Sequence, residues 1–330
     1  MLTARYKLKD IFCQAWLSHA VSAVARRGIP DVVPDSGSVH TDEIAKSCDL
    51  DAPTVYRVMR ALAANGIFDE RAPHQFAHND VSRLLRSEPD SWRGMALMWN
   101  HPSCVTAWMN FGECLEDGRS GIEHAFGKTL YEHLGEDPAG TAAFSDAMIS
   151  NSALVAKALA KAMPFDRFAS VLDLAGGVGT FLLAVLDEHP QLRGAVYEIR
   201  DLEAAAKATL GDRAEVIVGS FLEKVPNQFD LYMVKNSMWN WDDDNCLTIM
   251  QNVREAIGKD MQKRFAIIEY VIDEANAAWS TLYDLQILNM PGGRARTREE
   301  YRELLKKARF EIEDVMHVED QTVIMARPTA

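Results

Sequence analysis

The sequence predicts an α/β fold, with a doubly wound parallel sheet in the C-terminal half and an all-helical N-terminal part that includes a winged helix. From residue 170 onward, apolar strand patterns alternate with helical patterns, which is typical of parallel sheets with helices on both faces. The first of these strands runs into a glycine-rich turn at residues 175–179. Residues 41–66 carry the start and stop signals of two short consecutive helices.

The composition is that of an ordinary globular protein of 330 residues, with 48% hydrophobic and 25% charged residues. This length fits two domains better than one. No apolar run of about 18 residues and no secretion signal is present, so we expect a cytoplasmic protein that does not enter a membrane. The five cysteines are scattered without a Cys-x-x-Cys pair, so neither a disulfide framework nor a metal site is predicted.

The segment 41–66 has the pattern of a helix-turn-helix. Thr41 and Asp51 are the expected N-caps of its two helices, and Pro53 fits a first helical turn. Gly66 marks the expected end of the second helix. Residues 67–78 would then form the wing of a winged helix.

Charge argues against a DNA-binding role for this winged helix, because a DNA reader needs a cationic face to neutralise phosphates. Residues 1–95 carry 12 basic and 12 acidic side chains, and Arg57 and Arg60 alone are too few. We therefore expect no nucleic-acid partner and a homodimerisation module instead. An apolar stripe at helical spacing, interrupted by His19, supports this: Phe12, Ala15, Trp16, Ala20 and Ala23. The alternative is that this stripe packs within its own subunit.

Residues 96–165 are predicted to be helical and to connect the two parts. Large apolar side chains are concentrated here: Trp99, Trp108, Phe111, Phe126, Phe144 and Met148. They form either ordinary core or the lining of a pocket for a planar ligand, since such pockets are mostly apolar with a few polar groups.

The C-terminal sheet is predicted element by element from its apolar runs. Helices are expected to begin near Thr180, Asp201 and Asp243, between the strands. A final pair, 312–317 and 322–326, has the pattern of a hairpin at the edge. The five preceding strands are expected at 170–174, 195–198, 214–218, 231–234 and 265–270.

The glycine-rich turn predicts a site for a nucleotide-like cofactor. Gly176, Gly177 and Gly179 allow the backbone to approach a ligand, and the following helix presents free N–H groups to it. Asp173 lies at the end of the first strand, and Glu198 ends the next strand, where a carboxylate can accept ribose hydroxyls. This pattern alone leaves a dinucleotide such as NAD possible.

The block Val-Lys-Asn-Ser-Met-Trp-Asn-Trp-Asp-Asp at 234–243 resembles the Leu-Lys-x-x-Leu-His-Asp-Trp-Asp-Asp block of the S-adenosylmethionine (SAM)-dependent small-molecule O-methyltransferases of the caffeate type. The order of blocks from residue 126 to the C-terminus resembles that family too. The resemblance implies a Rossmann-like SAM methyltransferase domain with an N-terminal winged-helix dimerisation domain. The expected division is 1–95 for dimerisation, 96–165 for a helical linker and substrate pocket, and 166–330 for SAM binding.

The resemblance also implies the residues that hold SAM. Ser220 departs from the family, which usually has an aspartate there to accept the adenine amino group, and a hydroxyl accepts less strongly than a charged oxygen. The implied cofactor residues are Asp173, Gly176 and Gly179 for the methionine end, Glu198 for the ribose, Ser220 and Phe221 for the adenine, and Lys235 beside the cofactor. The expected pocket for a planar small-molecule substrate comprises Trp99, Trp108, Phe126, Met148, Met238 and Asn289.

The catalytic positions depart further from the family pattern. Trp239 stands where the family keeps its histidine base, and Ala295 replaces the acidic residue of the Gly-Gly-x-Glu-Arg-Thr turn, whereas Glu269 is retained. Trp239, Glu269 and Arg296 are therefore the catalytic candidates. Loss of a general base typically costs about 10²- to 10⁴-fold when the nucleophile must shed a proton. Efficient methylation of an unactivated phenol is not expected.

Three interpretations of this loss are open. The acceptor can be nucleophilic without a base, as a heteroaromatic nitrogen, a carboxylate or an acidic enol is, which resembles the phenazine-1-carboxylate N-methyltransferase of the family. A displaced histidine, His101, His124 or His133, can act instead. Alternatively, SAM is bound without methyl transfer, as in pericyclases and a hydroxylase of the same fold.

Two further expectations concern the substrate. The flat face of Trp239 would stack on a planar substrate beside the cofactor. Arg294 and Arg296, in the turn nearby, would bind an anionic group of that substrate unless they are solvated or structural.

Overall fold

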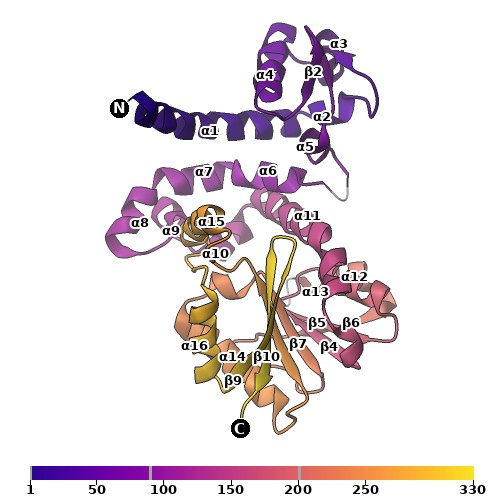
Figure 1. Ribbon diagram of the computed structural model, residues 1–330, viewed down its shortest axis with the longest axis vertical. Coiled ribbons are helices and arrows are strands. Elements are labelled where there is room, and N and C mark those ends of the chain that lie inside the picture. Colours follow the sequence, from indigo (N-terminus) through magenta and orange to yellow (C-terminus); the bar gives the residue numbers. More distant parts are fainter. Residues whose placement is uncertain (1, 89–90, 200–201) are drawn as a thin grey trace. The chain divides into compact units, whose positions relative to one another are not determined.

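The computed structural model describes residues 2–88, 91–199 and 202–330. The chain forms two compact units (Figure 1). The first consists of Met1–Val105 and Asp137–Asn151, and the second of Thr106–Glu136 and Ser152–Ala330. Among the described residues, no helix combines the length and the apolar composition that crossing a membrane requires.

The first unit contains the predicted helix-turn-helix and wing. Its described strands form a sheet in the order β1-β3-β2, and its small core closes around side chains such as Ile44, Met59 and Phe76, which are fully buried. The elements are α1 (Leu2–Arg26), α2 (Ile29–Val32), β1 (Val39–His40), α3 (Thr41–Cys48), α4 (Ala52–Ala64), β2 (Asp69–Ala72), β3 (Gln75–Ala77), α5 (Asp80–Arg83) and α6 (Arg93–Trp99).

One of the two predicted N-caps is confirmed and the other is wrong. The carboxylate of Asp51 accepts a hydrogen bond from the backbone N–H of Thr54 at 3.0 Å, and so caps α4. The cap of α3 is His40, whose Nδ1 accepts from the N–H of Asp42 at 3.2 Å. Thr41 is already helical, because its hydroxyl bonds to His74 Nδ1 instead, at 3.1 Å.

The apolar stripe on α1 is largely exposed. Phe12 is 63% and Trp16 is 69% exposed, and Ala15 and Ala23 are exposed as well. Only Ala20 of the predicted stripe contributes to the core of the unit, as a partly buried side chain. The interpretation that the stripe packs within its own subunit is therefore not what the structure shows.

The second unit begins with short helices. These are the last residues of α7 (Pro102–Met109) and then the complete helices α8 (Phe111–Asp117), α9 (Gly121–Phe126) and α10 (Leu130–Glu136). The chain then passes through residues 137–151, which belong to the first unit. The second unit resumes at Ser152, within α11 (Pro138–Ala162). The helical prediction for this region is confirmed.

A sheet follows, which within the described residues has seven strands in the order β6-β5-β4-β7-β8-β10-β9. The predicted strands are confirmed with small shifts of their ends, but the sheet is mixed rather than fully parallel, because β10 pairs antiparallel with both β8 and β9. The strands are β4 (Ser170–Leu174), β5 (Arg193–Glu198), β6 (Ala214–Val218), β7 (Leu231–Lys235), β8 (Arg264–Glu269), β9 (Phe310–Val318) and β10 (Gln321–Pro328).

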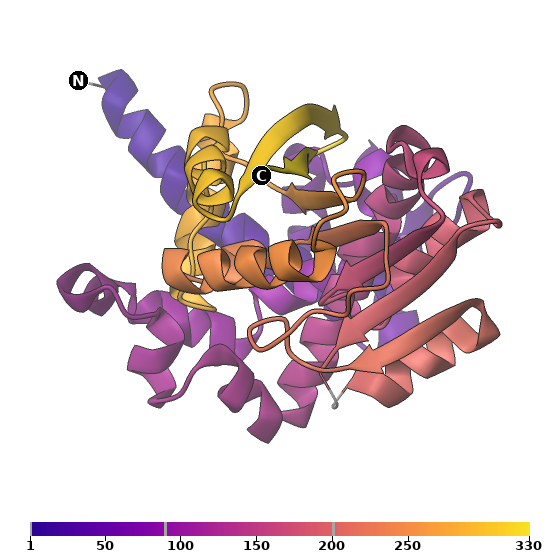
Figure 2. The same cartoon turned by 90° about the horizontal axis from the view of Figure 1, so that it is seen from below.

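Helices cover both faces of this sheet (Figure 2). One apolar cluster joins the strands to α14 (Asp243–Ile257) and α16 (Arg298–Lys307). A second cluster joins the opposite face to α11, α12 (Thr180–Glu188) and α13 (Glu203–Leu210). The predicted helix start at Asp201 lies outside the described residues. A further helix, α15 (Ala277–Asn289), precedes α16.

Candidate functional site

The carboxyl ends of β4 and β7 mark the point where the chain changes direction across the sheet. From β4 the chain proceeds outward through β5 and β6, and it returns to add β7 on the other side of β4. Such a switch point is where open α/β sheets bind ligands. Ala175 and Asn236 directly follow these strands with positive φ angles of 55° and 53°. Non-glycine residues in this region are strained and cluster at functional sites.

The glycine-rich turn is crowded by the protein's own atoms. A Cβ on Gly176 would lie 2.6 Å from Asp173 Oδ2, and a Cβ on Gly179 would lie 2.8 Å from the side chain of Leu210. Gly179 also has φ of 86° at the N-cap of α12. Glycine is therefore required at positions 176 and 179 because the protein's own side chains lie too close for a Cβ. The sequence had predicted a different reason, the approach of a ligand to the backbone.

Asp173 is buried beside this turn, and its Oδ1 has no hydrogen-bond partner among the described residues. Burial raises the pKa of Asp173 to about 7, against the opposing effect of the Lys235 ammonium. Burial lowers the pKa of Lys235 to about 8, and its Nζ donates to the Ser152 hydroxyl at 3.0 Å. A buried acceptor without a partner is costly unless a ligand or water satisfies it.

Glu198 connects the glycine-rich turn to the end of β5. Its Oε2 accepts from the N–H of Gly177 and its Oε1 from the N–H of Ile199, both at 2.8 Å. Burial raises the pKa of Glu198. A carboxylate has about four lone-pair sites, so both oxygens can accept further donors such as hydroxyls.

Ser220 and Phe221 follow β6 and lie near Glu198 through the backbone. The N–H of Gly219 donates to the carbonyl of Glu198 at 3.0 Å. The Ser220 hydroxyl accepts from the N–H of Leu222 at 3.3 Å, and Phe221 is 9% exposed. The structure therefore brings the predicted cofactor residues together at the carboxyl ends of β4, β5, β6 and β7.

Glu269, at the end of β8, holds the loop that carries Trp239. Its Oε1 accepts from the N–H groups of Ser237 and Trp239, both at 3.1 Å, and its Oε2 accepts from the Tyr301 hydroxyl. The carboxyl is 1% exposed, and burial raises its pKa to about 7. Glu269 is thus bound to backbone rather than directed at open space.

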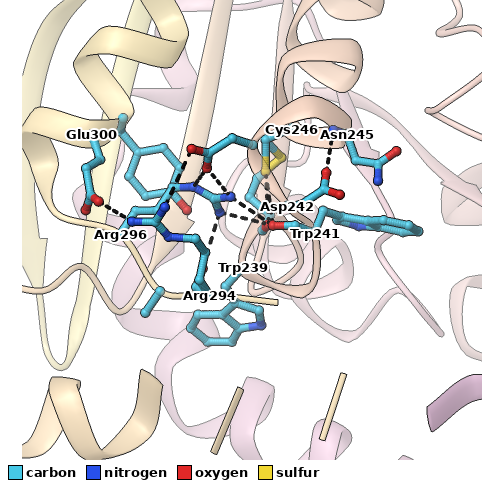
Figure 3. A network of polar contacts seen from close by, with 12 residues as sticks. Trp239, Trp241, Asp242, Asn245, Cys246, Arg294, Arg296 and Glu300 are labelled. Atoms are coloured by element: carbon cyan, nitrogen blue, oxygen red, sulfur yellow. Dashed lines mark hydrogen bonds and ion pairs between the residues drawn. The ribbon is translucent and has the colours of Figure 1, made fainter. Parts of the chain in front are cut away.

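Arg296 binds backbone carbonyl oxygens of the same loop, the one that carries Trp239 (Figure 3). It donates to the carbonyl oxygens of Met238 (3.4 Å), Trp241 (2.9 Å) and Arg294 (3.2 Å), and twice to Asp243 Oδ1 (2.9 and 2.7 Å). These five bonds to described residues use the five N–H donors of a guanidinium. The side chain is 0% exposed.

The expectation that Arg294 and Arg296 bind an anionic group is therefore wrong for Arg296. No donor of Arg296 is left over, and burial of the whole side chain separates it from any ligand. Arg294 lies 3.6 Å from Asp243 and pairs with Glu300 at the surface. Arg296 serves the structure of the turn, which was the alternative that the sequence left open, and binding of an anionic group by the 46% exposed Arg294 stays a prediction.

Trp239 is enclosed in an aromatic cluster. Its indole stacks on Tyr270, with centroids 5.3 Å apart and an interplanar angle of 15°, and Tyr283 packs against it at 5.1 Å and 58°. Ile287 completes the cluster, and Trp239 is only 4% exposed. The structure thus does not show the expected open stacking face, because Tyr270 covers one face of the indole and the residue is almost completely buried.

The predicted pocket residues divide between the two units. Trp99, which meets Trp92 edge to face, and Met148 belong to the first unit. In the second unit, Met238 is fully buried and the Trp108 indole donates to Gln286 Oε1 at 2.7 Å.

Asn289 and Phe126 also lie in the second unit. Asn289 is fully buried, and neither its Oδ1 nor its Nδ2 has a hydrogen-bond partner among the described residues. Its Oδ1 lies 2.0 Å from the place where Gly121 would carry a Cβ. Phe126 stacks on His133 with centroids 4.1 Å apart.

The candidate histidines have other neighbours than Trp239. His124 Nε2 lies 3.0 Å from Asp117 Oδ1, His133 stacks on Phe126, and His101 is in the first unit, where its Nδ1 accepts from the N–H of Ser103 at 3.4 Å. Within the described residues, no group of three or more His, Cys, Asp and Glu side chains is placed to hold a metal ion.

Sequence reasoning missed Tyr270, Tyr283 and Tyr301. Tyr270 directly follows Glu269 on the chain, and Tyr283 and Ile287 lie four residues apart on α15. Helical spacing could have paired the last two, since residues four apart share one face of a helix. Their common neighbour Trp239 could not be found this way, because it is distant in sequence.

Two family models match the chain. One, described as the O-methyltransferase domain, matches residues 108–311, and the other, described as the O-methyltransferase dimerisation domain, matches residues 10–88. The chain belongs to the O-methyltransferase family. It is a SAM-dependent methyltransferase with a Rossmann-like fold, and SAM is its cofactor.

Named relatives cover nearly all of this methyltransferase. It is 30% identical to the mitomycin biosynthesis 6-O-methyltransferase of Streptomyces lavendulae, over 94% of this chain and 90% of the relative. It is 29% identical to the phenazine-1-carboxylate N-methyltransferase of Pseudomonas aeruginosa, over 99% and 98%. The solved structure of CalO1, a methyltransferase in calicheamicin biosynthesis in its SAH-bound form, superimposes with a TM-score of 0.90 at 27% identity, covering 100% of this chain and 99% of that one.

The residues of this methyltransferase fit its cofactor. SAM carries a cationic amino group, a sulfonium and ribose hydroxyls, and the buried Asp173 oxygen without a partner can accept from such donors. Glu198 adds acceptor capacity at the neighbouring strand end.

Proposed function

We propose that this enzyme methylates a planar (hetero)aromatic secondary metabolite without a histidine general base. The acceptor atom is a ring nitrogen, a carboxylate oxygen or an acidic hydroxyl that is already ionised. The observation that carries the proposal is Trp239 at the position of the family's base, since the indole nitrogen is a donor only and cannot take a proton. The rings in contact with it are those of Tyr270 and Tyr283, not of a histidine.

The cofactor residues of the proposal are those gathered at the strand ends. SAM, when bound, supplies an electrophilic methyl group on sulfur. Asp173 and the backbone at Gly176 and Gly179 would hold its methionine end, Glu198 its ribose, and Ser220 with Phe221 its adenine, with Lys235 alongside. Support comes from the unpartnered Asp173 oxygen and from the Gly177–Glu198 bond, which fixes the turn against the ribose-binding carboxylate.

The rate would arise from proximity and orientation. An acceptor that already has a free lone pair needs only to be held in line with the methyl carbon, and such positioning supplies a large part of many enzymatic rates. Glu269 and Arg296 act as positioning residues in this scheme, because they bind the N–H and carbonyl groups of the loop that carries Trp239.

The pH profile of turnover tests the base-free mechanism. With methyl-labelled SAM and phenazine-1-carboxylate, we expect labelled product and a pH profile of kcat to which no histidine contributes a titration near the roughly 6.5 of imidazole. A titration of Glu269, whose pKa burial raises to about 7, would persist unchanged in histidine variants. SAM must be saturating, because protonation of Asp173 below its pKa of about 7 removes negative charge and weakens binding of the cationic cofactor. A titration near 6.5 that His101→Ala, His124→Ala or His133→Ala eliminates would contradict the proposal. Conversion of the substrate without label would indicate a non-methylating activity instead.

We further propose that the enzyme is a homodimer through α1 and the surrounding dimerisation domain. The exposed Phe12 and Trp16 support this, because large apolar side chains exposed together mark contact surfaces. Light scattering should give a dimer for the intact chain, and Phe12→Asp with Trp16→Asp should give a monomer. Gln14→Asp, an exposed polar site on the same helix, is the matched control. A monomeric intact chain would refute the proposal.

A further inference from the structure

Asn236, directly after β7, carries a buried acceptor that nothing in the described part of the chain satisfies. Its Oδ1 has no hydrogen-bond partner there, and its backbone has a φ of 53°. Asparagine tolerates this left-handed conformation better than most residues, so the backbone accounts for the residue type. It does not account for the side-chain oxygen, because a buried polar atom without a partner is costly and is usually matched by water, an ion or a ligand.

A second unmatched oxygen at these strand ends is Oδ1 of Asp173, on the neighbouring strand β4. The last register pair of β4 and β7 in the described residues is Leu174–Val234. Beyond it, the N–H of Ala175 donates to a carbonyl of β5 and the N–H of Asn236 to a carbonyl of β8, both at 2.9 Å. The two strand ends thus bond outward, and the residues with the unmatched oxygens lie on either side of the switch point.

Lys235, the cation next to Asn236 in the chain, is not the missing partner. Its Nζ donates to the Ser152 hydroxyl at 3.0 Å and makes no bond to Asn236 Oδ1. What remains is one carboxylate oxygen of Asp173 and one neutral amide oxygen, which together suit a cation with several N–H donors. SAM has one such group, the α-ammonium of its methionine part, since its sulfonium has no N–H and its ribose offers neutral hydroxyls.

We propose that Asn236 Oδ1 accepts a hydrogen bond from the α-ammonium group of SAM. Asp173 is the charged acceptor of the same group. The inference rests on the proposed placement of the methionine end at Asp173, and not on the base-free step. S-adenosylhomocysteine keeps this ammonium after the methyl group has left. The contact therefore acts on the binding of cofactor and product rather than on methyl transfer itself.

Asn236→Gly separates the role of the amide from that of the backbone. Glycine adopts positive φ without steric cost, so the variant should fold like the wild type and lose only the acceptor. By calorimetry, we expect the Kd of S-adenosylhomocysteine to rise about tenfold or more, as for one lost hydrogen bond to a charged group. Decarboxylated S-adenosylhomocysteine, which keeps the amine, should lose affinity by the same factor. Methylthioadenosine, which lacks the amine, should bind both proteins equally.

Two matched variants complete the test. Asn236→Asp keeps an acceptor oxygen and adds negative charge, so the Kd of S-adenosylhomocysteine should stay the same or fall. Asp49 also has a φ of 53°, and it is exposed at the end of α3 in the first unit. Asp49→Gly, which relieves the same backbone conformation there, should leave this Kd unchanged.

The inference is overturned if Asn236→Gly binds S-adenosylhomocysteine as tightly as the wild type, or if its affinity for methylthioadenosine falls by the same factor. A loss in Asn236→Asp as large as that in Asn236→Gly would mean that the nitrogen of the amide faces the ligand, which also overturns it. Absence of methyl transfer to phenazine-1-carboxylate, together with the expected binding results, would refute the proposed function and leave this inference standing.

Discussion

Gly176→Val is expected to abolish SAM binding. The first carbon of the new side chain would lie 2.6 Å from Asp173 Oδ2 and 2.8 Å from its Cγ, so Asp173 must move. Asp173 is fully buried and has no free space on the strand side, because β4 is buried throughout. Its displacement removes the acceptor that the cofactor's cationic end requires. Calorimetry should show an affinity loss of at least about 100-fold, since overpacking costs about 1–3 kcal/mol, the lost hydrogen bond to a charged group costs about 1.5–3 kcal/mol more, and about 1.4 kcal/mol is tenfold in affinity.

Gly112→Ala is the matched control for this variant. Gly112 lies on α8 in the same unit, and a Cβ there would meet nothing within 4 Å. Its SAM affinity should equal that of the wild type. Unchanged SAM affinity in Gly176→Val would remove the glycine-rich turn from the cofactor site, and with it the assignment of Asp173.

The parts of the fold that the sequence predicted well are those with local signals. The strand at 170–174 and the turn after it combine a buried apolar run with glycines, and both signals lie within ten residues. The antiparallel insertion of β10 between β8 and β9 has no such signal, because strand order depends on pairings between distant segments. His40 displaced Thr41 as a cap for a similar reason, since His74, 33 residues away, took the threonine hydroxyl.

In the candidate site, too, contacts between residues distant in sequence could not be predicted. A sequence motif locates Trp239 and Arg296 but does not show what surrounds them. Trp239 meets Tyr270 and Tyr283, which are 31 and 44 positions further along the chain, and their packing closes the face that was expected to be open. Burial of Arg296 follows from the loop of residues 238–241 folding over it, which no local pattern indicates.

Arg296→Lys is expected to destabilise the enzyme strongly although it preserves the charge. An ammonium has three donors on a flexible stem and cannot reproduce the five directed bonds of the guanidinium. The carbonyls of Trp241 and Arg294 would lose their guanidinium partners in the interior, at about 1–3 kcal/mol for a group left unmatched, whereas the Met238 carbonyl keeps the N–H of Trp241 and the Cys246 thiol. Urea unfolding at constant m-value should show a loss of about 3 kcal/mol, partly offset where the lysine retains Asp243.

Arg294→Lys provides the control, since it makes the same chemical change two residues away in the same turn. The Arg294 side chain is 46% exposed and pairs with Asp243 and Glu300 at the surface. Exposed pairs contribute about 0–1 kcal/mol, so its unfolding midpoint should stay close to that of the wild type. Equal effects of the two substitutions would mean that Arg296 contributes only its charge. If the guanidinium is structural, a large loss of stability should be confined to Arg296→Lys, and the loop that carries Trp239 should be held less firmly in that variant. The reason is that only the planar guanidinium donates to three carbonyl oxygens at once.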